Sequence, residues 1–323
     1  MSFDMLNVFV TGGAGLIGSY LVDLLCEKNI NVKVIDNLYR GKKDYISNFN
    51  KIKFIEADIL DVKKYSNEIE NIDTVFHLAS KVLGIGYSNA NHSEMLLYND
   101  KMTNSLLEAL ENVKKLKHLV IISSSCIYDD NGPDTVSEDC LDGSPEKANL
   151  GYGLAKRFLE EKAKVWCKEK NIKLTVLRPF NIYGERYTWA GENSQGLPSL
   201  VKKIMDNNGN IEIWGSGNQS RTYLHAKDCA RIIFTLAQNN DKDFNVFNVG
   251  LKETLSLKTL AELMCSIYNI QPNFTFRTDK PEGRFIKSAD ERKIESYYPS
   301  FKKDLLSIEN GLARMKDWYL KTF

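Results

Sequence analysis

Short apolar runs alternate with amphipathic segments along the first half of the chain. The apolar runs predict strands at 7–11, 31–35, 52–56, 74–78, 118–122 and 174–178. Helical spacing of apolar residues predicts helices over 16–27, 94–111 and 152–168. Strands that alternate with helices favour βαβ units, whose parallel strands form a sheet covered by helices on both faces. The pattern therefore predicts an α/β fold with a Rossmann-type, doubly wound parallel sheet.

The alternation weakens after residue 178. Loops rich in Gly, Asn and Ser surround short strand-like pieces at 211–214 and 245–250, and helices are predicted near 197–206, 257–268 and 308–320. We expect residues 1–178 to form the sheet domain and residues 179–323 to form a smaller α/β region, with some segments returning to the sheet. The smaller region would cap the edge of the sheet at which ligands bind.

The charge balance excludes several classes of protein. Among 323 residues, 43 Lys and Arg side chains face 42 Asp and Glu side chains, which leaves a net charge of +1. Nucleic-acid-binding domains usually carry a basic excess, so we expect no nucleic acid partner. No apolar run approaches the roughly 18 residues of a membrane-spanning helix, and the N-terminal segment lacks the basic start of a signal peptide. We therefore expect a cytoplasmic protein with no membrane partner.

The six cysteines are scattered at positions 26, 126, 140, 167, 229 and 265. None forms a Cys-x-x-Cys pair, and no histidine stands at metal-binding spacing from any of them. We therefore predict neither a disulfide scaffold nor a metal site. Most of these thiols are expected to be inert packing residues. Cys126 is the exception, because it follows a predicted strand and a run of three serines.

The segment TGGAGLIG places Gly12, Gly15 and Gly18 between the first predicted strand and the first predicted helix. Glycines at this spacing allow a tight turn and let a pyrophosphate approach the helix N-terminus, so the motif predicts a dinucleotide site. Asp36 ends the second predicted strand, where a carboxylate can bind ribose hydroxyls and repel a 2′-phosphate. We therefore predict NAD, although Arg40 nearby keeps NADP as an alternative. Asp58 and the residue after it would border the adenine.

A second motif predicts acid–base chemistry. Ser123, Ser124 and Ser125 follow a predicted strand, and Tyr152 and Lys156 stand four residues apart on the next helix. Residues at this spacing share one helix face. An ammonium beside a phenol lowers the pKa of the phenol, which makes a tyrosine usable as an acid or base near neutral pH. A serine hydroxyl nearby can hydrogen-bond the same substrate oxygen.

Together these motifs resemble the extended short-chain dehydrogenase/reductase superfamily, in particular its NAD-dependent nucleotide-sugar epimerase/dehydratase family. The resemblance covers essentially the whole chain and includes the segment RPFNIYG at 178–184. Within that family, several segments are most similar to the GDP-mannose 3,5-epimerases. These segments are GIGY at 84–87, NHSEMLLYND at 91–100, SSSCIY at 123–128, TW at 188–189, WGSGNQSR at 214–221 and PEGR at 281–284.

The resemblance implies a role for each matching position. The residues that would hold NAD are Gly12, Gly15, Leu16, Ile17, Asp36, Asn37, Asp58, Ile59, Leu78, Ala79, Ser123, Tyr152, Lys156 and Ile182. Those that would contact the nucleotide sugar are Gly84, Ser124, Ser125, Asn181, Trp214, Arg221 and Arg284. Residues 1–178 would thus carry the cofactor and the catalytic residues, and residues 179–323 would bind the nucleotide sugar.

The resemblance also implies the chemistry. Tyr152 would take the proton of the sugar C4 hydroxyl, Ser124 would hold that oxygen, and Lys156 would bind the nicotinamide ribose and lower the pKa of Tyr152. Arg221 and Arg284 would grip the diphosphate, because guanidinium groups suit phosphate oxygens. We expect a GDP-linked sugar as substrate and a homodimer built on the helices at 94–111 and 152–168.

Cys126 matches the cysteine that works as an acid or base at C3 and C5 in the 3,5-epimerases; its alternative role is packing at a strand end. The family's second acid–base residue, a lysine, has no equivalent here, since Gln195 or Gly196 stands at that position and Glu192 is only a nearby candidate. Epimerisation at C3, C5 or both is therefore our first hypothesis. C4 dehydrogenation, reduction of a 4-keto sugar, C4 epimerisation and, least favoured, a non-enzymatic dinucleotide sensor are the alternatives.

Overall fold

A seven-stranded sheet forms the centre of the protein in the computed structural model, which describes residues 5–189, 194, 196–279 and 284–323. Its strands are β1 (Asn7–Thr11), β2 (Asn31–Asp36), β3 (Lys53–Glu56), β4 (Thr74–His77), β5 (His118–Ile122), β7 (Lys173–Pro179) and β12 (Phe244–Val249). The spatial order is β12-β7-β5-β4-β1-β2-β3, and every pairing is parallel. The predicted doubly wound α/β fold is confirmed.

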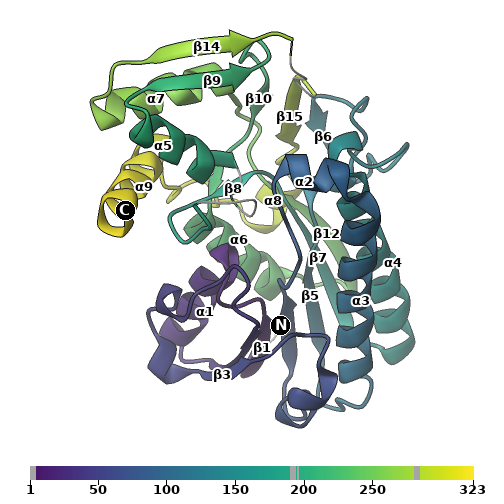
Figure 1. Ribbon diagram of the computed structural model, residues 1–323. Coiled ribbons are helices and arrows are strands. Elements are labelled where there is room, and N and C mark those ends of the chain that lie inside the picture. Colours follow the sequence, from purple (N-terminus) through teal and green to yellow (C-terminus); the bar gives the residue numbers. More distant parts are fainter. Residues whose placement is uncertain (1–4, 190–193, 195, 280–283) are drawn as a thin grey trace.

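Helices cover both faces of this sheet (Figure 1). On one face, α1 (Leu16–Glu27) packs beside α6 (Ala226–Asn239). On the other face, α3 (His92–Leu110) packs beside α4 (Leu150–Lys170). Successive side chains of a strand point to opposite faces, so Val8 and Val10 of β1 join the first core and Phe9 joins the second. All three are fully buried, which explains why the strand is a continuous apolar run.

A smaller α/β region lies at the carboxyl end of the sheet and has a core of its own. It contains α5 (Gly196–Asp206), β9 (Asn210–Trp214), α7 (Leu257–Tyr268), β14 (Asn273–Arg277) and α9 (Ile308–Thr322). Short pieces join it to the sheet: α2 (Ile85–Ala90), β6 (Thr135–Val136), β8 (Ile182–Tyr183), β10 (Ser220–Arg221), β11 (Leu224–His225), β13 (Leu255–Ser256), β15 (Ile286–Ala289) and α8 (Arg292–Tyr297).

The two regions interleave along the chain. β6 comes from the first half of the sequence, yet it pairs with β15 near the C-terminus. β12 and α6, from the second half, belong to the large sheet and its cover. The sequence pattern did not predict α6 and anticipated β12 only as a strand-like piece. Segments from each side of the predicted boundary at residue 178 therefore pack in the region on the other side.

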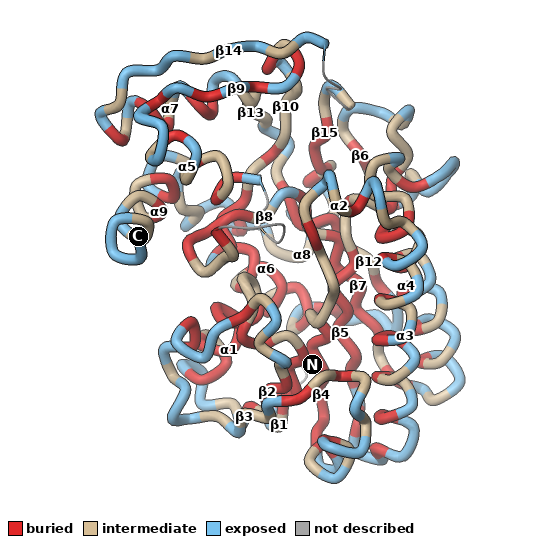
Figure 2. The backbone as a smooth tube through the Cα atoms, viewed as in Figure 1, coloured by how far each residue is buried: buried red, intermediate tan, exposed pale blue. Residues whose placement is uncertain are grey.

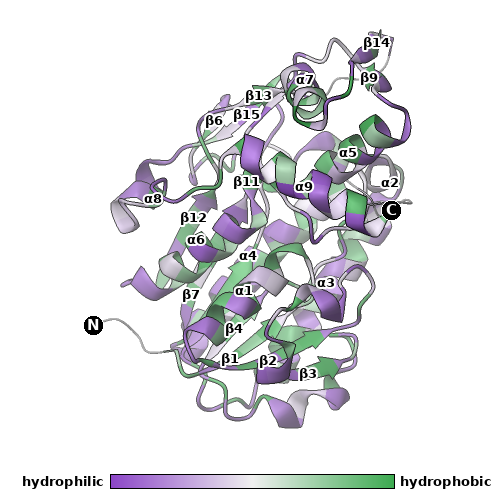
Figure 3. Cartoon of the chain, turned by 90° about the vertical axis from the view of Figure 1, so that its left-hand side faces the viewer, coloured by the Kyte–Doolittle hydropathy of each residue, from purple (hydrophilic) through white to green (hydrophobic). Residues whose placement is uncertain are grey.

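Hydrophobic and polar positions follow this layering. The strands of the large sheet are mostly hydrophobic, whereas helices turn hydrophilic residues outward (Figure 3). Buried backbone runs through the sheet and exposed backbone follows the outer helix faces (Figure 2). Across the ranges that the structure describes, no helix is both long and apolar enough to cross a bilayer.

The turn between β1 and α1 depends on close backbone contact at Gly18. A Cβ at Gly18 would collide with the carbonyl oxygen of Gly12 and come within 2.8 Å of the Gly13 Cα, both of which are backbone atoms. Gly18→Ala should therefore lower the free energy of unfolding by about 1–3 kcal/mol, the usual range for overpacking. Urea titration followed by circular dichroism measures this change.

Gly86→Ala is the matched control, because Gly86 is exposed on α2 and a Cβ there would meet no atom within 4 Å. This substitution should leave stability unchanged or raise it by about 0.4–1 kcal/mol, since it restricts the unfolded chain. Equal effects of the two substitutions would show that the glycine turn tolerates a side chain.

Candidate active site

One large cavity, about 1030 Å³ in volume, lies between the carboxyl ends of the strands and the smaller region. Every site residue predicted from the sequence lines it except Arg284. Its lining comes from the glycine turn after β1, the ends of β2, β4 and β5, the start of α4, and the strands β8, β9 and β10. This volume falls at the upper end of the range of small-molecule pockets, so it can hold two extended ligands end to end.

The glycine turn lies on the floor of this cavity. Gly12 has a left-handed backbone conformation with φ of +70°, and a Cβ there would lie 2.7 Å from the amide nitrogen of Ala79. Gly15 is the N-cap of α1 and offers no side chain to its first amides. A helix start without a side-chain cap leaves N–H groups free for an anion, so the turn fits a dinucleotide pyrophosphate.

Asp36 is held rigidly at the end of β2. One carboxylate oxygen accepts the Ala14 amide at 2.9 Å and the other accepts the Leu38 amide at 2.8 Å. Burial nevertheless raises the pKa of Asp36, because the two amides do not fully replace water. A fixed carboxylate beside the glycine turn fits ribose hydroxyls.

Arg40, which the sequence left as a candidate for a 2′-phosphate, lines the cavity, and its buried Nε has no hydrogen-bond partner among the described residues. Its guanidinium donates to the Val82 carbonyl and lies 5.0 Å from the centre of the Tyr187 ring. Asp36 is bonded directly to the glycine turn through Ala14, whereas Arg40 contacts Val82 and Tyr187 at the cavity wall.

The serine run ends β5 at the cavity wall. The Ser124 hydroxyl accepts the backbone N–H of Cys126 at 3.1 Å, which caps the short 3-10 helix Ser125–Ile127. The Ser123 hydroxyl is buried and has no hydrogen-bond partner among the residues that the structure describes. A buried unpartnered hydroxyl in a ligand cavity is costly unless a ligand satisfies it, which agrees with a cofactor position.

Lys156 reaches across from α4 to the sheet. Its ammonium donates to the carbonyl of Ile122 at 2.7 Å, and its side chain is buried. Burial lowers the pKa of Lys156 to about 8, because the charged form loses its water. The amine lies 5.6 Å from the centre of the Tyr152 ring.

Tyr152 departs from the expectation that Lys156 would lower its pKa. Burial raises the pKa of Tyr152 well above the usual value, and the nearby Cys126 adds to that rise. A hydrogen bond with Ser80 and the charge of Arg40 act in the opposite direction. Desolvation of the phenolate is larger than these effects, so the prediction of a lowered pKa is wrong for this arrangement.

Arg284 does not line the cavity, although its charge acts on Arg221, which does. Its guanidinium donates to the carbonyls of Asp129, Gly132 and Pro133, and to that of Ile286 at 2.8 Å. These bonds use its donors to fasten the loop after residue 128 to β15, so Arg284 does not line the cavity. The sequence motif suggested an arginine near a phosphate site, but it gave no sign of the backbone carbonyls to which Arg284 donates.

Arg221 does line the cavity, and its guanidinium donates to the Ser220 carbonyl at 2.8 Å. Burial lowers its pKa, and the carboxylate of Glu146 opposes that shift. Gly196, at the start of α5, also lines the cavity, where it has no side chain to carry a proton. The other two candidates for the family's missing lysine, Gln195 and Glu192, lie outside the described residues.

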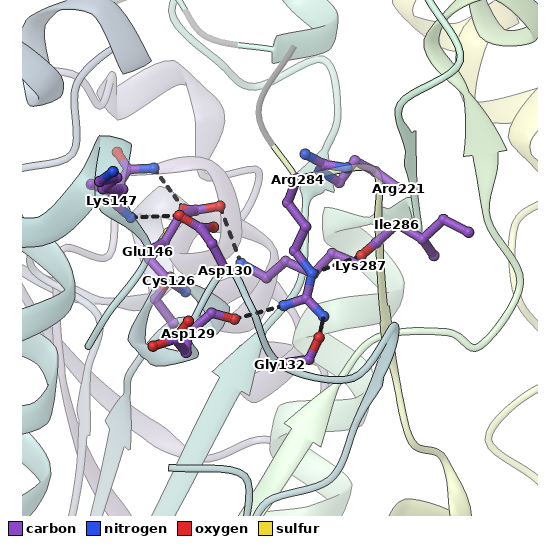
Figure 4. Close-up of polar contacts among 12 residues, drawn as sticks. Cys126, Asp129, Asp130, Gly132, Glu146, Lys147, Arg221, Arg284, Ile286 and Lys287 are labelled. Carbon is purple, nitrogen blue, oxygen red and sulfur yellow. Dashed lines mark hydrogen bonds and ion pairs between the residues drawn. The ribbon is translucent and has the colours of Figure 1, made fainter. Parts of the chain in front are cut away.

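Two charged residues near Cys126 were missed by the sequence analysis. Glu146 and Lys287 form an ion pair beside the thiol (Figure 4). Glu146 stands six residues before Tyr152, and this closeness to a predicted catalytic residue could have marked Glu146 as a candidate. Lys287 is far away in the sequence and gave no signal. Burial and the charge of Glu146 raise the pKa of Cys126 to about 12.

Comparison with known proteins agrees with this geometry. GDP-mannose 3,5-epimerase 1 of Oryza sativa subsp. indica is 26% identical over 81% of this chain and 69% of its own. A putative UDP-glucose 4-epimerase of Methanocaldococcus jannaschii is 29% identical over 96% and 97%. The crystal structure of UDP-glucuronic acid 4-epimerase from Bacillus cereus, in complex with UDP-glucuronic acid and NAD, has a TM-score of 0.84 and 27% identity over 98% of this chain and 100% of its own.

The likeness to the 3,5-epimerases is thus no stronger than the likeness to 4-epimerases. The expectation of NAD is confirmed. A model described as the NAD dependent epimerase/dehydratase family matches residues 8–250. Since this match spans most of the chain, the protein belongs to the NAD dependent epimerase/dehydratase family.

Proposed function

We propose that this protein oxidises C4 of a nucleotide-linked hexose transiently and epimerises the sugar at C3, C5 or both. The observation that supports this most is the cavity itself. It brings the glycine turn and Asp36 together with Ser124, Tyr152 and Cys126 on one continuous wall. The glycine turn and Asp36 suit NAD. Ser124 and Tyr152 suit a C4 hydroxyl, and the thiol suits proton transfer at a carbon beside C4.

The chain's own residues would divide the work as follows. The glycine turn and Asp36 hold the cofactor, and Lys156 binds its nicotinamide ribose. When bound, NAD supplies the acceptor for the hydrogen on C4. Tyr152 takes the proton of the C4 hydroxyl while Ser124 donates a hydrogen bond to that oxygen. These groups already surround the cavity, so little rearrangement is needed before reaction.

Oxidation at C4 changes the chemistry of its neighbours. A carbonyl at C4 stabilises a carbanion at C3 or C5 as an enolate, so the protons on these carbons become acidic. Cys126 lies at the cavity wall within electrostatic reach of Tyr152. We assign Cys126 the proton transfer on one face of the sugar, because general acid–base groups must lie close to the carbon that they deprotonate.

The nucleotide end of the substrate would lie against the smaller region. Trp214 of β9 is half exposed at the cavity, where its ring can cover a base, and Arg221, which also lines the cavity, would contact the diphosphate. Asn181, Gly84 and Ser125 line the space between. We favour a GDP-sugar from the sequence resemblance, and the similar 4-epimerase structures with UDP-sugars make UDP the alternative.

C4 epimerisation is the second candidate. It needs Tyr152, Lys156 and a keto sugar that rotates in the cavity, but it does not need Cys126. Gly196 favours it, because the described part of the cavity shows no lysine at the position of the family's second acid–base residue. The two candidates differ in one observable, the exchange of protons at C3 and C5.

The holoenzyme incubated in deuterium oxide with GDP-mannose, and with UDP-glucose for comparison, tests the proposal by NMR. We expect deuterium at C3 or C5 of the accepted sugar. Cys126→Ala should lower this exchange by about 100-fold or more, the usual contribution of an acid–base group, and should leave reduction of the cofactor intact.

Tyr152→Phe is the matched control, because it should abolish both cofactor reduction and deuterium exchange. Turnover of a UDP-sugar at C4 without deuterium at C3 or C5 would favour the C4 epimerase. Exchange that survives Cys126→Ala would contradict the role of the thiol.

Asp36→Asn keeps the size of the side chain and removes its charge. We expect affinity for NAD to fall by about 10-fold or more, since hydrogen bonds to charged groups contribute about 1.5–3 kcal/mol. Affinity for NADP should rise at the same time, because the repulsion of its 2′-phosphate disappears. Calorimetric titration with both dinucleotides measures this. Asp61→Asn, at an exposed position away from the cavity, should change neither affinity.

We also propose a homodimer built on α3 and α4. Three large apolar side chains on these helices are exposed: Leu97 by 57%, Phe158 by 43% and Val165 by 57%. Phe158 and Val165 stand seven residues apart on α4 and so share one face. Exposed backbone follows the outer sides of both helices in Figure 2.

The double variant Phe158→Glu/Val165→Glu should be a monomer, because charges at the centre of an interface oppose its burial. Light scattering after gel filtration gives the mass of the particle. Leu320→Glu, at a side chain on α9 that is 60% exposed, should leave the dimer intact. A monomeric wild-type protein would contradict this proposal.

A further inference from the structure

The Arg40 side chain joins three separate segments of the cavity wall. Arg40 lies in the loop after β2, Val82 in the loop after β4, and Tyr187 after β8. All three residues line the cavity. The guanidinium donates to the Val82 carbonyl, and its central carbon lies 5.0 Å from the centre of the Tyr187 ring. One side chain thus connects wall segments that are far apart along the chain.

The order of the strands shows what this side chain passes over. β1 lies between β2 and β4 and pairs with both. The loops after β2 and β4 therefore stand on opposite sides of the glycine turn that follows β1. The chain runs outward from β1 to β3 and then returns to β4 on the other side of β1. Dinucleotides bind at such a reversal of strand order, so the Arg40 side chain crosses the expected cofactor crevice.

The backbone at the start of this crossing is fixed to the glycine turn. A Cβ at Gly41 would lie 2.6 Å from the carbonyl carbon of Ala14, and the Lys42 backbone N–H donates to the Ala14 carbonyl at 3.3 Å. The Asp36 carboxylate accepts the Ala14 amide at 2.9 Å. The loop after β2 is therefore held against the turn on both sides of Arg40. Opening of the crevice requires rotation of the side chain rather than movement of this loop.

The Tyr187 ring offers the guanidinium a fixed support. The Tyr187 carbonyl accepts the hydroxyl of Tyr45 at 3.2 Å. Its neighbour Arg186 donates to Asp23 of α1 at 2.8 Å and to Ser47 at 3.0 Å. The Arg186 and Asp23 side chains are only 14% and 11% exposed, so solvent screens this ion pair little. Guanidinium groups pack favourably on an aromatic face that is held in this way.

One donor of Arg40 is left over. Its Nε is buried and has no hydrogen-bond partner among the described residues. A buried donor on a charged group is costly unless an acceptor satisfies it. The pyrophosphate of NAD carries anionic oxygens, which guanidinium groups bind well. The amides of the glycine turn and the Arg40 guanidinium would thus contact the same pyrophosphate from two sides.

We propose that Arg40 is a latch over the dinucleotide: its side chain closes the crevice above NAD and must swing away before the cofactor enters or leaves. The bond to Val82 and the contact with Tyr187 hold the latch shut, and Nε–H donates to an oxygen of the pyrophosphate. This inference goes beyond the proposed function. It holds for C3 or C5 epimerisation and for C4 epimerisation alike, since both use NAD.

A latch of this kind suits an epimerase better than a net oxidoreductase. An epimerase regenerates its cofactor within each cycle, because the sugar is first oxidised and then reduced again at C4. The cofactor therefore never has to leave between turnovers. A dehydrogenase or a reductase must exchange its cofactor every time, and a latch would slow that exchange.

Exchange of bound NAD measures the latch without any sugar. The holoenzyme is loaded with isotopically labelled NAD and mixed with excess unlabelled NAD, and the label retained after rapid desalting gives the dissociation rate. Arg40→Met keeps most of the side-chain length and removes the guanidinium. Release should become about 10-fold faster or more, because hydrogen bonds from a charged group are lost. Association, followed by stopped-flow protein fluorescence, should be no slower, because the crevice stands open.

Lys42→Met is the matched control for charge. Lys42 is exposed and does not line the cavity, so the loss of its charge two residues from Arg40 should change neither rate. Tyr187→Leu removes the supporting ring and should speed release, whereas Tyr187→Phe keeps the ring and should not. If Arg40→Met fails to fold, as judged by circular dichroism, the two Tyr187 variants decide.

An unchanged release rate in Arg40→Met would overturn the latch. Faster release together with slower association would also overturn it, because that combination is the signature of a lost charge attraction. Since no sugar takes part, failure of the proposed epimerisation leaves this measurement unaffected.

Hydrogen exchange of the holoenzyme gives a second readout. In Arg40→Met the amides of residues 78–84, in the loop after β4, should exchange faster with solvent, because the bond to the Val82 carbonyl is gone. Lys42→Met should leave the exchange of this segment unchanged. Unchanged exchange in Arg40→Met would show that Arg40 does not hold this loop, and it would contradict the latch even if NAD left faster.

Discussion

The all-parallel sheet is the constraint on which the rest of the structure depends. Helices cover both of its faces, so its strands are mostly apolar, and many of the polar side chains that reach a ligand cavity stand where the strands end. Parallel strands all end at the same edge. The glycine turn after β1, Asp36 of β2, Leu78 after β4 and Ser123 after β5 therefore meet in one cavity, although they are spread over more than a third of the chain.

The same burial that builds the cavity also sets its chemistry. It raises the pKa values of Tyr152 and Cys126 and lowers that of Lys156, because each charged form loses water. Each group is therefore biased toward its neutral form. Neighbouring side chains change the size of this effect: Ser80 lowers the pKa of Tyr152, whereas Glu146 raises that of Cys126.

How much the sequence could predict depends on how far apart the interacting residues lie along the chain. β1 and α1 were predicted at their observed bounds, because a local apolar run and helical spacing determine them. Residues that end strands were placed in the cavity for the same reason. The bonds of Arg284 to backbone carbonyls could not be predicted, because most of these carbonyls lie in a loop more than 150 residues away. Glu146 and Lys287 were missed, because a pair separated by 141 residues leaves no local pattern.

The near-neutral net charge of the whole chain does not extend to the cavity. The net charge is +1, yet the described cavity wall carries Lys81, Lys156, Arg186, Lys203, Arg40 and Arg221 against Asp36, Asp58 and Glu212. Asp36 and Asp58 follow β2 and β3, and Glu212 of β9 accepts a hydrogen bond from the ring nitrogen of Trp214 at 2.9 Å. The cationic side chains outnumber the carboxylates of the lining, although Lys81 and Arg186 are paired with Glu94 and Asp23 outside it. A local cationic excess of this kind can bind phosphate groups without a basic excess over the rest of the surface.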